Sequence, residues 1–112
     1  MKRSITTSIL RSEIVTFDVE FPLYRKSDAT LDEGVAATYS RIGVDMREVS
    51  IAYTSFEGTE TYVIQVNPAS FQIEGGRGVR EDLVLGKGEH ACTAEEFNSV
   101  MRKAIQAIEG QP

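Results

Sequence analysis

The residues of this sequence with the sharpest chemical potential are its one histidine and its one cysteine, His90 and Cys92. In an extended segment, two residues at this spacing point to the same face, with their Cβ atoms about 7 Å apart. Such a pair could serve as a nucleophile with its base, or as half of a zinc site. Zinc would need one or two further ligands, and only carboxylates such as Glu89 are left to supply them.

A structural interpretation of the same pair is favoured. Cys92 stands just before Thr93, the residue expected to cap a helix, and Phe97 occupies the fourth helical position. These are the two positions that a hydrophobic staple fills with apolar side chains. We therefore predict no catalytic residue, no metal ligand and no bound cofactor in this chain.

Paired carboxylates suggest acid and base catalysis, and a glycine-rich stretch suggests phosphate binding, but neither pattern meets the requirements of that chemistry. Acid and base catalysis needs two carboxyl groups in different environments, one of them shielded from water. The glycine-rich stretch over 75–88 lacks the spacing of a phosphate-binding loop, because Glu81 stands where the first glycine would be. The paired carboxylates are expected to be solvated or to cap a helix: Asp18 with Glu20, Asp32 with Glu33, Glu81 with Asp82, and Glu95 with Glu96.

Contact with a partner is the remaining use for polar side chains in loops. One candidate group is an aromatic and basic cluster after Pro22, in a segment that we predict to be a loop. The other is a pair of basic residues in the glycine-rich stretch, where residues 75–80 are expected to form an exposed loop. The candidate contact residues are Tyr24, Arg25, Lys26, Arg77 and Lys87.

The composition limits the classes to which this protein can belong. The chain has 112 residues, 41% of them hydrophobic, and a net charge of −5. This length favours one globular domain over residues 1–112, and the acidic balance argues against nucleic acid as a partner. No apolar run is long enough for a membrane span or a signal peptide, and one cysteine cannot form an internal disulfide. We therefore expect a cytoplasmic protein that binds neither membranes nor nucleic acids.

One helix has a clear signature at the C-terminal end of the sequence. Thr93 and Glu96 form a capping box, and Gly110 follows the last apolar residue. A helix from Thr93 to about Glu109 is predicted, and its apolar stripe should be buried against a sheet, with Ile105 near the centre. The stripe consists of Phe97, Val100, Met101, Ala104, Ile105 and Ile108.

Strands are predicted from alternation and from cross-strand matching. Residues 14–21 alternate apolar and polar side chains, and Pro22 ends the run. A hairpin centred on Glu57 and Gly58, with either a two-residue turn or a loop over 56–59, matches large side chains in pairs. The pairs are Val49 with Val66, Ile51 with Ile64, and Tyr53 with Tyr62.

Two segments are less sharply defined. Residues 31–42 favour a strand, although their spacing also suits a helix ended by Gly43. Residues 83–91 are predicted to form a short hairpin across Gly86-Lys87-Gly88 that leads into the C-terminal helix.

The predicted fold is α+β: a curved antiparallel sheet of about four to six strands, packed on one face by the C-terminal helix. The leading hypothesis for function is a protein-interaction or self-associating module without catalytic activity, because the chain is small and acidic and lacks convergent catalytic side chains. The alternative is a small-ligand-binding protein or small enzyme, with a pocket between the sheet and its loops and contacts from Tyr24, Tyr39 or His90.

Overall fold

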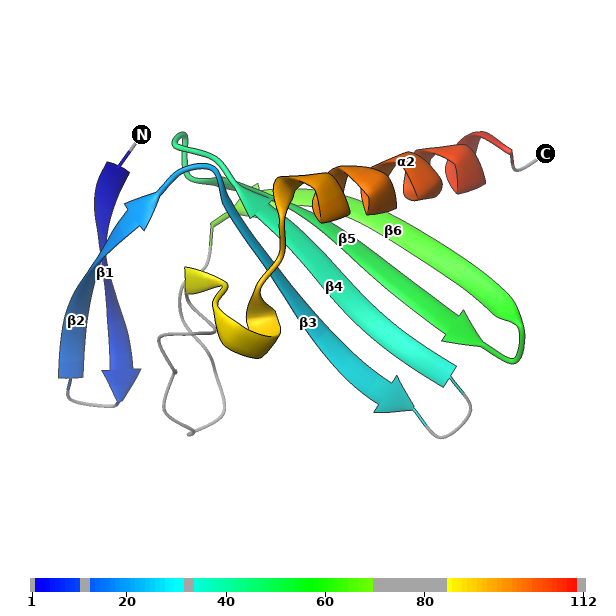
Figure 1. Ribbon diagram of the computed structural model, residues 1–112, viewed down its shortest axis with the longest axis horizontal. Helices are drawn as coiled ribbons and strands as arrows, with labels where there is room; N and C mark the ends of the chain where they lie inside the picture. The colour runs from blue at the N-terminus through cyan, green and yellow to red at the C-terminus, as the bar shows by residue number, and fades with distance from the viewer. Residues whose placement is uncertain (1, 11–12, 32–33, 70–84, 111–112) are drawn as a thin grey trace.

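The computed structural model describes residues 2–10, 13–31, 34–69 and 85–110. Its strands are β1 (Lys2–Leu10), β2 (Glu13–Glu20), β3 (Leu23–Leu31), β4 (Gly34–Ile42), β5 (Arg47–Phe56) and β6 (Thr59–Pro68). A short 3-10 helix, η1 (Gly88–His90), leads into the helix α2 (Ala94–Glu109). The fold is α+β, as predicted: β3 to β6 form an antiparallel sheet in sequence order, β1 and β2 form a separate two-stranded sheet, and α2 lies over one face of the larger sheet (Figure 1).

The β5–β6 hairpin has the register that the sequence predicts. Large side chains lie opposite one another at all three predicted pairs, including Tyr53 with Tyr62. The turn has two residues, Glu57 with a φ of 50° and Gly58 with a φ of 79°. Positive φ at both positions is typical of the type I′ turn, whose twist matches that of the flanking strands. The Tyr53 and Tyr62 ring centroids are 5.0 Å apart, so the aromatic pair stabilises the hairpin.

The N-terminal half contains more strand than its sequence pattern indicates. The strand predicted over 14–21 is confirmed as β2, but its partner β1 was not predicted. The loop predicted after Pro22 is wrong, because β3 begins at Leu23. The strand interpretation of residues 31–42 is confirmed: Leu31 ends β3 and residues 34–42 form β4, so the helical alternative is wrong.

The segment before α2 also differs from its prediction. Instead of a hairpin, residues 88–90 form η1, and Ala91 makes an isolated antiparallel bridge to Arg25 on the outer edge of β3. Gly86 and Gly88 have φ angles of 65° and 59°, and they turn the chain along that edge rather than back onto a strand of its own. Residues 83–84 and the loop predicted over 75–80 lie outside the described residues.

Two apolar clusters hold these elements together. The first joins the end of β2 to the larger sheet, and its buried members are Val19, Phe21, Leu23 and Ile42. The second lies between α2 and the sheet, and its members Ile51, Phe97 and Ala104 have no exposed surface. The helix is therefore fixed to the sheet through about its first three turns.

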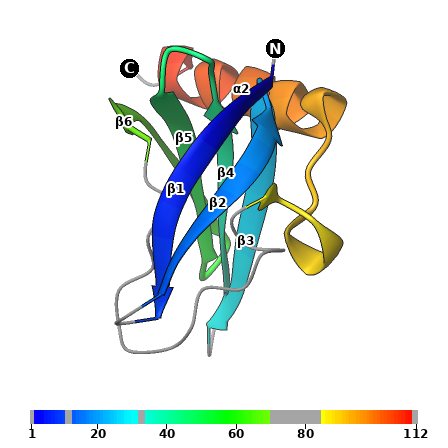
Figure 2. The same ribbon diagram turned by 90° about the vertical axis from the view of Figure 1, so that its left-hand side faces the viewer.

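The β1–β2 hairpin stands to one side of the larger sheet (Figures 1 and 2). It is anchored by the buried Val19 and by a hydrogen bond of 2.9 Å from Arg3 Nη1 to the Val44 carbonyl. A two-stranded hairpin is at best marginally stable on its own in water, so its order depends on this anchorage.

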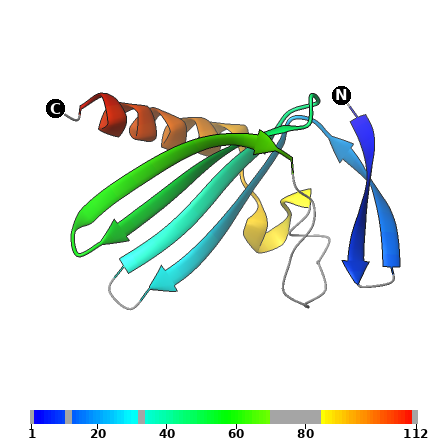
Figure 3. The ribbon, with the colours of Figure 1, turned by 180° about the vertical axis from the view of Figure 1, so that it is seen from behind.

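The helix begins at the predicted cap, but its apolar stripe is buried only in part. Thr93 Oγ1 accepts a hydrogen bond from the Glu96 N–H at 3.0 Å. Phe97 is fully buried, whereas Ile105 and Ile108 are 42% and 47% exposed. α2 runs at an angle to the strands and diverges from them toward its C-terminus (Figure 3). The expectation that Ile105 is buried at the centre of the stripe is therefore wrong.

The difference in burial between the two ends of the apolar stripe should appear as a difference in the free energy of unfolding. We expect Phe97→Ala to lower the free energy of unfolding by about 3 to 5 kcal/mol, because it empties a fully buried site. Ile105→Ala should lower it by less than about 1 kcal/mol, because the side chain keeps much of its contact with water. Denaturant unfolding monitored by circular dichroism measures both values. A cost for Ile105→Ala equal to that for Phe97→Ala would contradict the exposed position.

Candidate functional site

His90 and Cys92 contact different parts of the structure: His90 bonds to the backbone of β3, and Cys92 packs with the apolar cluster under α2. The His90 Nδ1–H donates to the Lys26 carbonyl of β3 at 3.0 Å, and Nε2 lies 3.4 Å from a carboxylate oxygen of Glu89. Cys92 packs with the cluster that contains Phe97, as a staple requires. Burial, followed by the negative charge of Glu96, raises the pKa of the Cys92 thiol, although Lys26 acts in the opposite direction. A raised pKa keeps the thiol protonated, which is the reverse of what a cysteine nucleophile needs.

The three candidate contact residues after Pro22 lie on β3 and face both sides of the sheet. Tyr24 packs against α2, with its ring centroid 5.7 Å from that of Phe97. Lys26 forms an ion pair of 2.9 Å with Glu96 of α2, and this hydrogen-bonded contact raises the pKa of its ammonium group. Arg25 points to the opposite face and pairs with Glu48 at 3.3 Å, where both side chains are less than one fifth exposed. All three therefore link β3 to its neighbours.

The other two candidate contacts are not part of this group. Lys87 is exposed and directly precedes η1. Arg77 lies outside the described residues. Of the five candidates, the structure thus brings together Tyr24 and Lys26 beside the start of α2.

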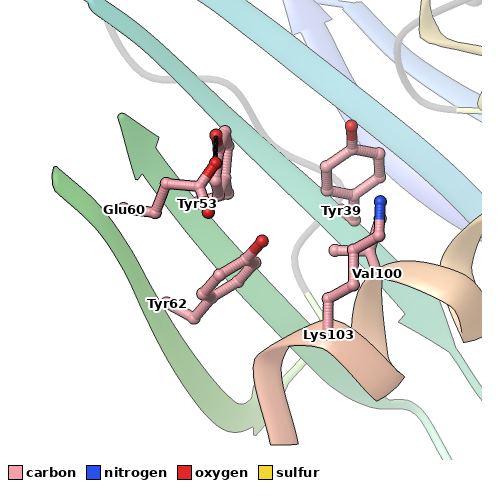
Figure 4. Close-up of a pocket in the computed structure, with 6 residues that line it drawn as sticks. All are labelled: Tyr39, Tyr53, Glu60, Tyr62, Val100 and Lys103. Atoms are coloured by element: carbon pink, nitrogen blue, oxygen red, sulfur yellow. Dashed lines mark hydrogen bonds between the residues drawn. The ribbon is translucent and has the colours of Figure 1, made fainter. Parts of the chain in front are cut away.

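A hollow of about 350 Å³ opens where α2 diverges from the strands (Figure 4). Tyr39 of β4, Tyr53 of β5 and Tyr62 of β6 supply its aromatic walls, and it is completed by Glu60 and by two residues of α2, Val100 and Lys103. We call this the tyrosine hollow. The alternation of the three strands explains it, because side chains at every second position point toward the helix.

Hydrogen bonding and charge define what the tyrosine hollow can do. The Tyr53 hydroxyl donates to Glu60 Oε1 at 3.0 Å. Burial raises the pKa of Tyr39 and of Tyr62, and nearby acidic groups add to both shifts. These phenols remain protonated at neutral pH and keep their O–H donors. The hollow offers aromatic surface, phenol donors, one carboxylate and one ammonium group, a set suited to binding a small planar molecule.

The alternative hypothesis expected a pocket between the sheet and its loops, and that pocket stays a prediction. The tyrosine hollow lies between the sheet and α2. Of the three expected contacts, Tyr39 lines it, whereas Tyr24 packs on Phe97 and His90 binds the β3 backbone. Tyr53 and Tyr62 were predicted only as a cross-strand pair, because the course of the helix above them is not encoded in strand alternation.

The two outer edges of the four-stranded sheet differ. The β3 edge is partly covered by residues 85–91, through the Arg25–Ala91 bridge and the His90 hydrogen bond to Lys26. The fit is close at Gly86, where a Cβ atom would overlap the Tyr24 carbonyl oxygen.

In the part of the chain that the structure describes, no strand pairs with the outer edge of β6. Val63 is 45% exposed on one face of this strand, and Val66 is 60% exposed on the other. Residues 61–67 contain no charged residue, no proline and no glycine. An uncharged edge strand of this length is a ready template for another strand. The run is visible in the sequence, but its place at an edge is decided by the strand order.

The described residues contain no group of three or more histidine, cysteine, aspartate or glutamate side chains that could hold a metal ion. Among them, α2 and η1 are too short or too polar to cross a membrane.

The surroundings of Cys92 predict slow alkylation. With a raised pKa and a half-buried thiol, we expect iodoacetamide at pH 7 to react several times more slowly with the folded protein than with the unfolded chain. His90→Ala should leave the folded-state rate unchanged, because the imidazole is bonded to Lys26 and lies beside Glu89. Mass spectrometry of timed samples measures both rates. Fast alkylation that slows in His90→Ala would reveal a nucleophile and its base.

Comparison with models of protein families, with curated proteins and with solved structures finds no match to this chain. The candidate surfaces are therefore defined by the residues themselves: the tyrosine hollow on one side of α2, and the open edge of β6 beside it.

Proposed function

We propose that this protein is a small cytoplasmic interaction module without catalytic activity, and that its partner is a second copy of the same chain. The observation that carries the proposal is the open edge of β6, which is ten residues long and bears exposed valines on both faces. Natural sheets usually protect an edge of this kind with charges, proline, a bulge or a covering segment. Here the only charged residue of β6 is Glu60, near its start, and the only proline is its last residue, Pro68.

The charge distribution favours a second copy over an unrelated basic partner. The net charge of −5 makes two copies repel each other at a distance. That repulsion is weakest where the approaching surfaces are uncharged, and residues 61–67 form such a surface. A second copy also offers an identical unpaired strand, so the backbone groups of both edges are satisfied at once.

The test is self-association measured by sedimentation equilibrium on the full chain. We expect a reversible dimer whose dissociation constant rises at least tenfold in Val66→Lys, because a lysine on the open edge opposes strand pairing. Val35→Lys is the matched control: Val35 is 47% exposed but lies on β4, an inner strand. A protein that stays monomeric at millimolar concentration, or a dimer equally weakened by both substitutions, would overturn the proposal.

A second candidate function is favoured by the tyrosine hollow, namely the binding of a small aromatic molecule. A thermal-shift screen with phenols, aromatic amines and aromatic carboxylates tests it. At a hundred times its dissociation constant, a ligand of the folded protein adds about 2.7 kcal/mol of stability.

We expect any such shift to disappear in Val100→Trp, which fills the hollow, and to persist in Ile105→Trp. Ile105 follows the hollow-lining Lys103 by two residues, so it lies on the other flank of α2. A shift retained in Val100→Trp would place the ligand elsewhere, and the absence of any shift would count against this second candidate.

A further inference from the structure

We infer that the two copies join as an antiparallel strand pair centred on Ile64, in which Glu60 of each copy faces Arg47 of the other. This inference rests on the proposed self-association through β6 and adds the register of the pair and the charged contact that selects it.

The turn of the hairpin decides which backbone groups are available. Phe56 and Thr59 flank the two-residue turn, so they form the hydrogen-bonded pair that closes it. Hydrogen-bonded and non-hydrogen-bonded pairs alternate along an antiparallel ladder. The odd-numbered residues of β6 therefore bond to β5, and the N–H and C=O groups of Glu60, Tyr62, Ile64 and Val66 point to the open edge.

The residues whose backbone groups point to the open edge are also those whose side chains face α2. This fixes the side of the sheet on which the two helices of a dimer would lie. Tyr62 and Ile64 pack with the helix, and Glu60 lines the hollow beside it. In an antiparallel pair, residues with outward backbone groups lie opposite one another and share a face of the sheet. Pairing of two β6 strands consequently gives one continuous sheet of eight strands with both α2 helices on the same side.

Three registers place residues with outward backbone groups opposite one another and have the two-fold axis near the middle of β6. With Val63 on the two-fold axis, the carboxylate of Glu60 would lie against Val66 of the other copy, which is unfavourable for both. With Gln65 on the axis, the two β6 strands overlap only over residues 62–68, against 60–68 with Ile64 on the axis, so Glu60 has no residue of the other β6 opposite it. Pro68, which has no N–H to donate, is paired in both of these registers and does not separate them. With Ile64 on the axis, Tyr62 covers Val66, the most exposed of the large apolar side chains of the described residues.

The Ile64 register also matches charges. Glu60 then lies opposite Pro68 of the other copy, and the next residue across the sheet is Arg47, which pairs with Pro68 within each chain. Glu60 and Arg47 share the helix side of the sheet. They would lie two strands apart, a total of about 10 Å, which is within the combined reach of their side chains. Both residues are exposed in the single chain.

Within one chain these two side chains cannot meet. Glu60 and Pro68 are eight residues apart on β6, which is about 27 Å along a strand, and Arg47 lies beside Pro68. Any coupling between Glu60 and Arg47 must therefore act between copies.

A charge-reversal experiment on the full chain uses this separation. We expect Glu60→Lys and Arg47→Glu each to raise the dissociation constant of the dimer about tenfold, since each dimer contains the contact twice. The double variant, which restores opposite charges, should return to within about threefold of the natural chain. Glu57→Lys changes the net charge as Glu60→Lys does but lies in the hairpin turn, so it is the matched control and should leave the constant unchanged.

The outcomes separate this inference from the function on which it rests. Rescue in the double variant supports the Ile64 register. A dimer that is sensitive to Val66→Lys but shows no rescue retains β6 as the interface and overturns the register. A chain that remains monomeric overturns both.

Discussion

The structure depends on the burial of Phe97 between α2 and the sheet. Its ring lies 5.7 Å from that of Tyr24, the Arg41 guanidinium stands 5.5 Å from its centroid, and none of it is exposed. Because the Thr93 cap and the Lys26–Glu96 ion pair act at the same end, the helix is held firmly at its start. The angle set there carries its C-terminal half away from the strands. The tyrosine hollow and the exposed Ile105 and Ile108 are both consequences of that angle.

The two outer edges of the larger sheet differ in how far the described residues cover them. At β3, polar side chains are satisfied within the chain, and the segment leading into α2 is laid along the edge. At β6, the described residues leave the edge bare, and its side chains are uncharged from Thr61 to Asn67. Among the described residues, the two edges of the larger sheet therefore differ in what they offer to a further strand, and the proposed interface lies at the β6 edge.

The predicted elements that are confirmed are defined by contacts close in sequence, although β1 was missed beside its sequence neighbour β2. The helix cap at Thr93 and the pairing of Tyr53 with Tyr62 follow from neighbouring residues, and both are confirmed. Strand β3 was missed because Arg25 and Lys26 break apolar alternation, and their acidic partners come from 23 and 70 residues away. The direction of α2 was missed for the same reason, and the hollow with it. The predicted absence of catalytic residues stays a prediction.

Gly86 has a consequence for the kind of assembly that this chain can form. With a φ of 65° and no side chain, it lets residues 85–91 approach the β3 backbone, where any larger residue would collide with Tyr24. In the proposed dimer, the same edge of the larger sheet, β6, is used by both copies, so the pair closes on itself. If residues 85–91 left β3, the larger sheet would present a second edge, and pairing of β3 in one copy with β6 in the next could continue without a natural end. The close fit of Gly86 against β3 would therefore favour a finite pair over a growing fibre.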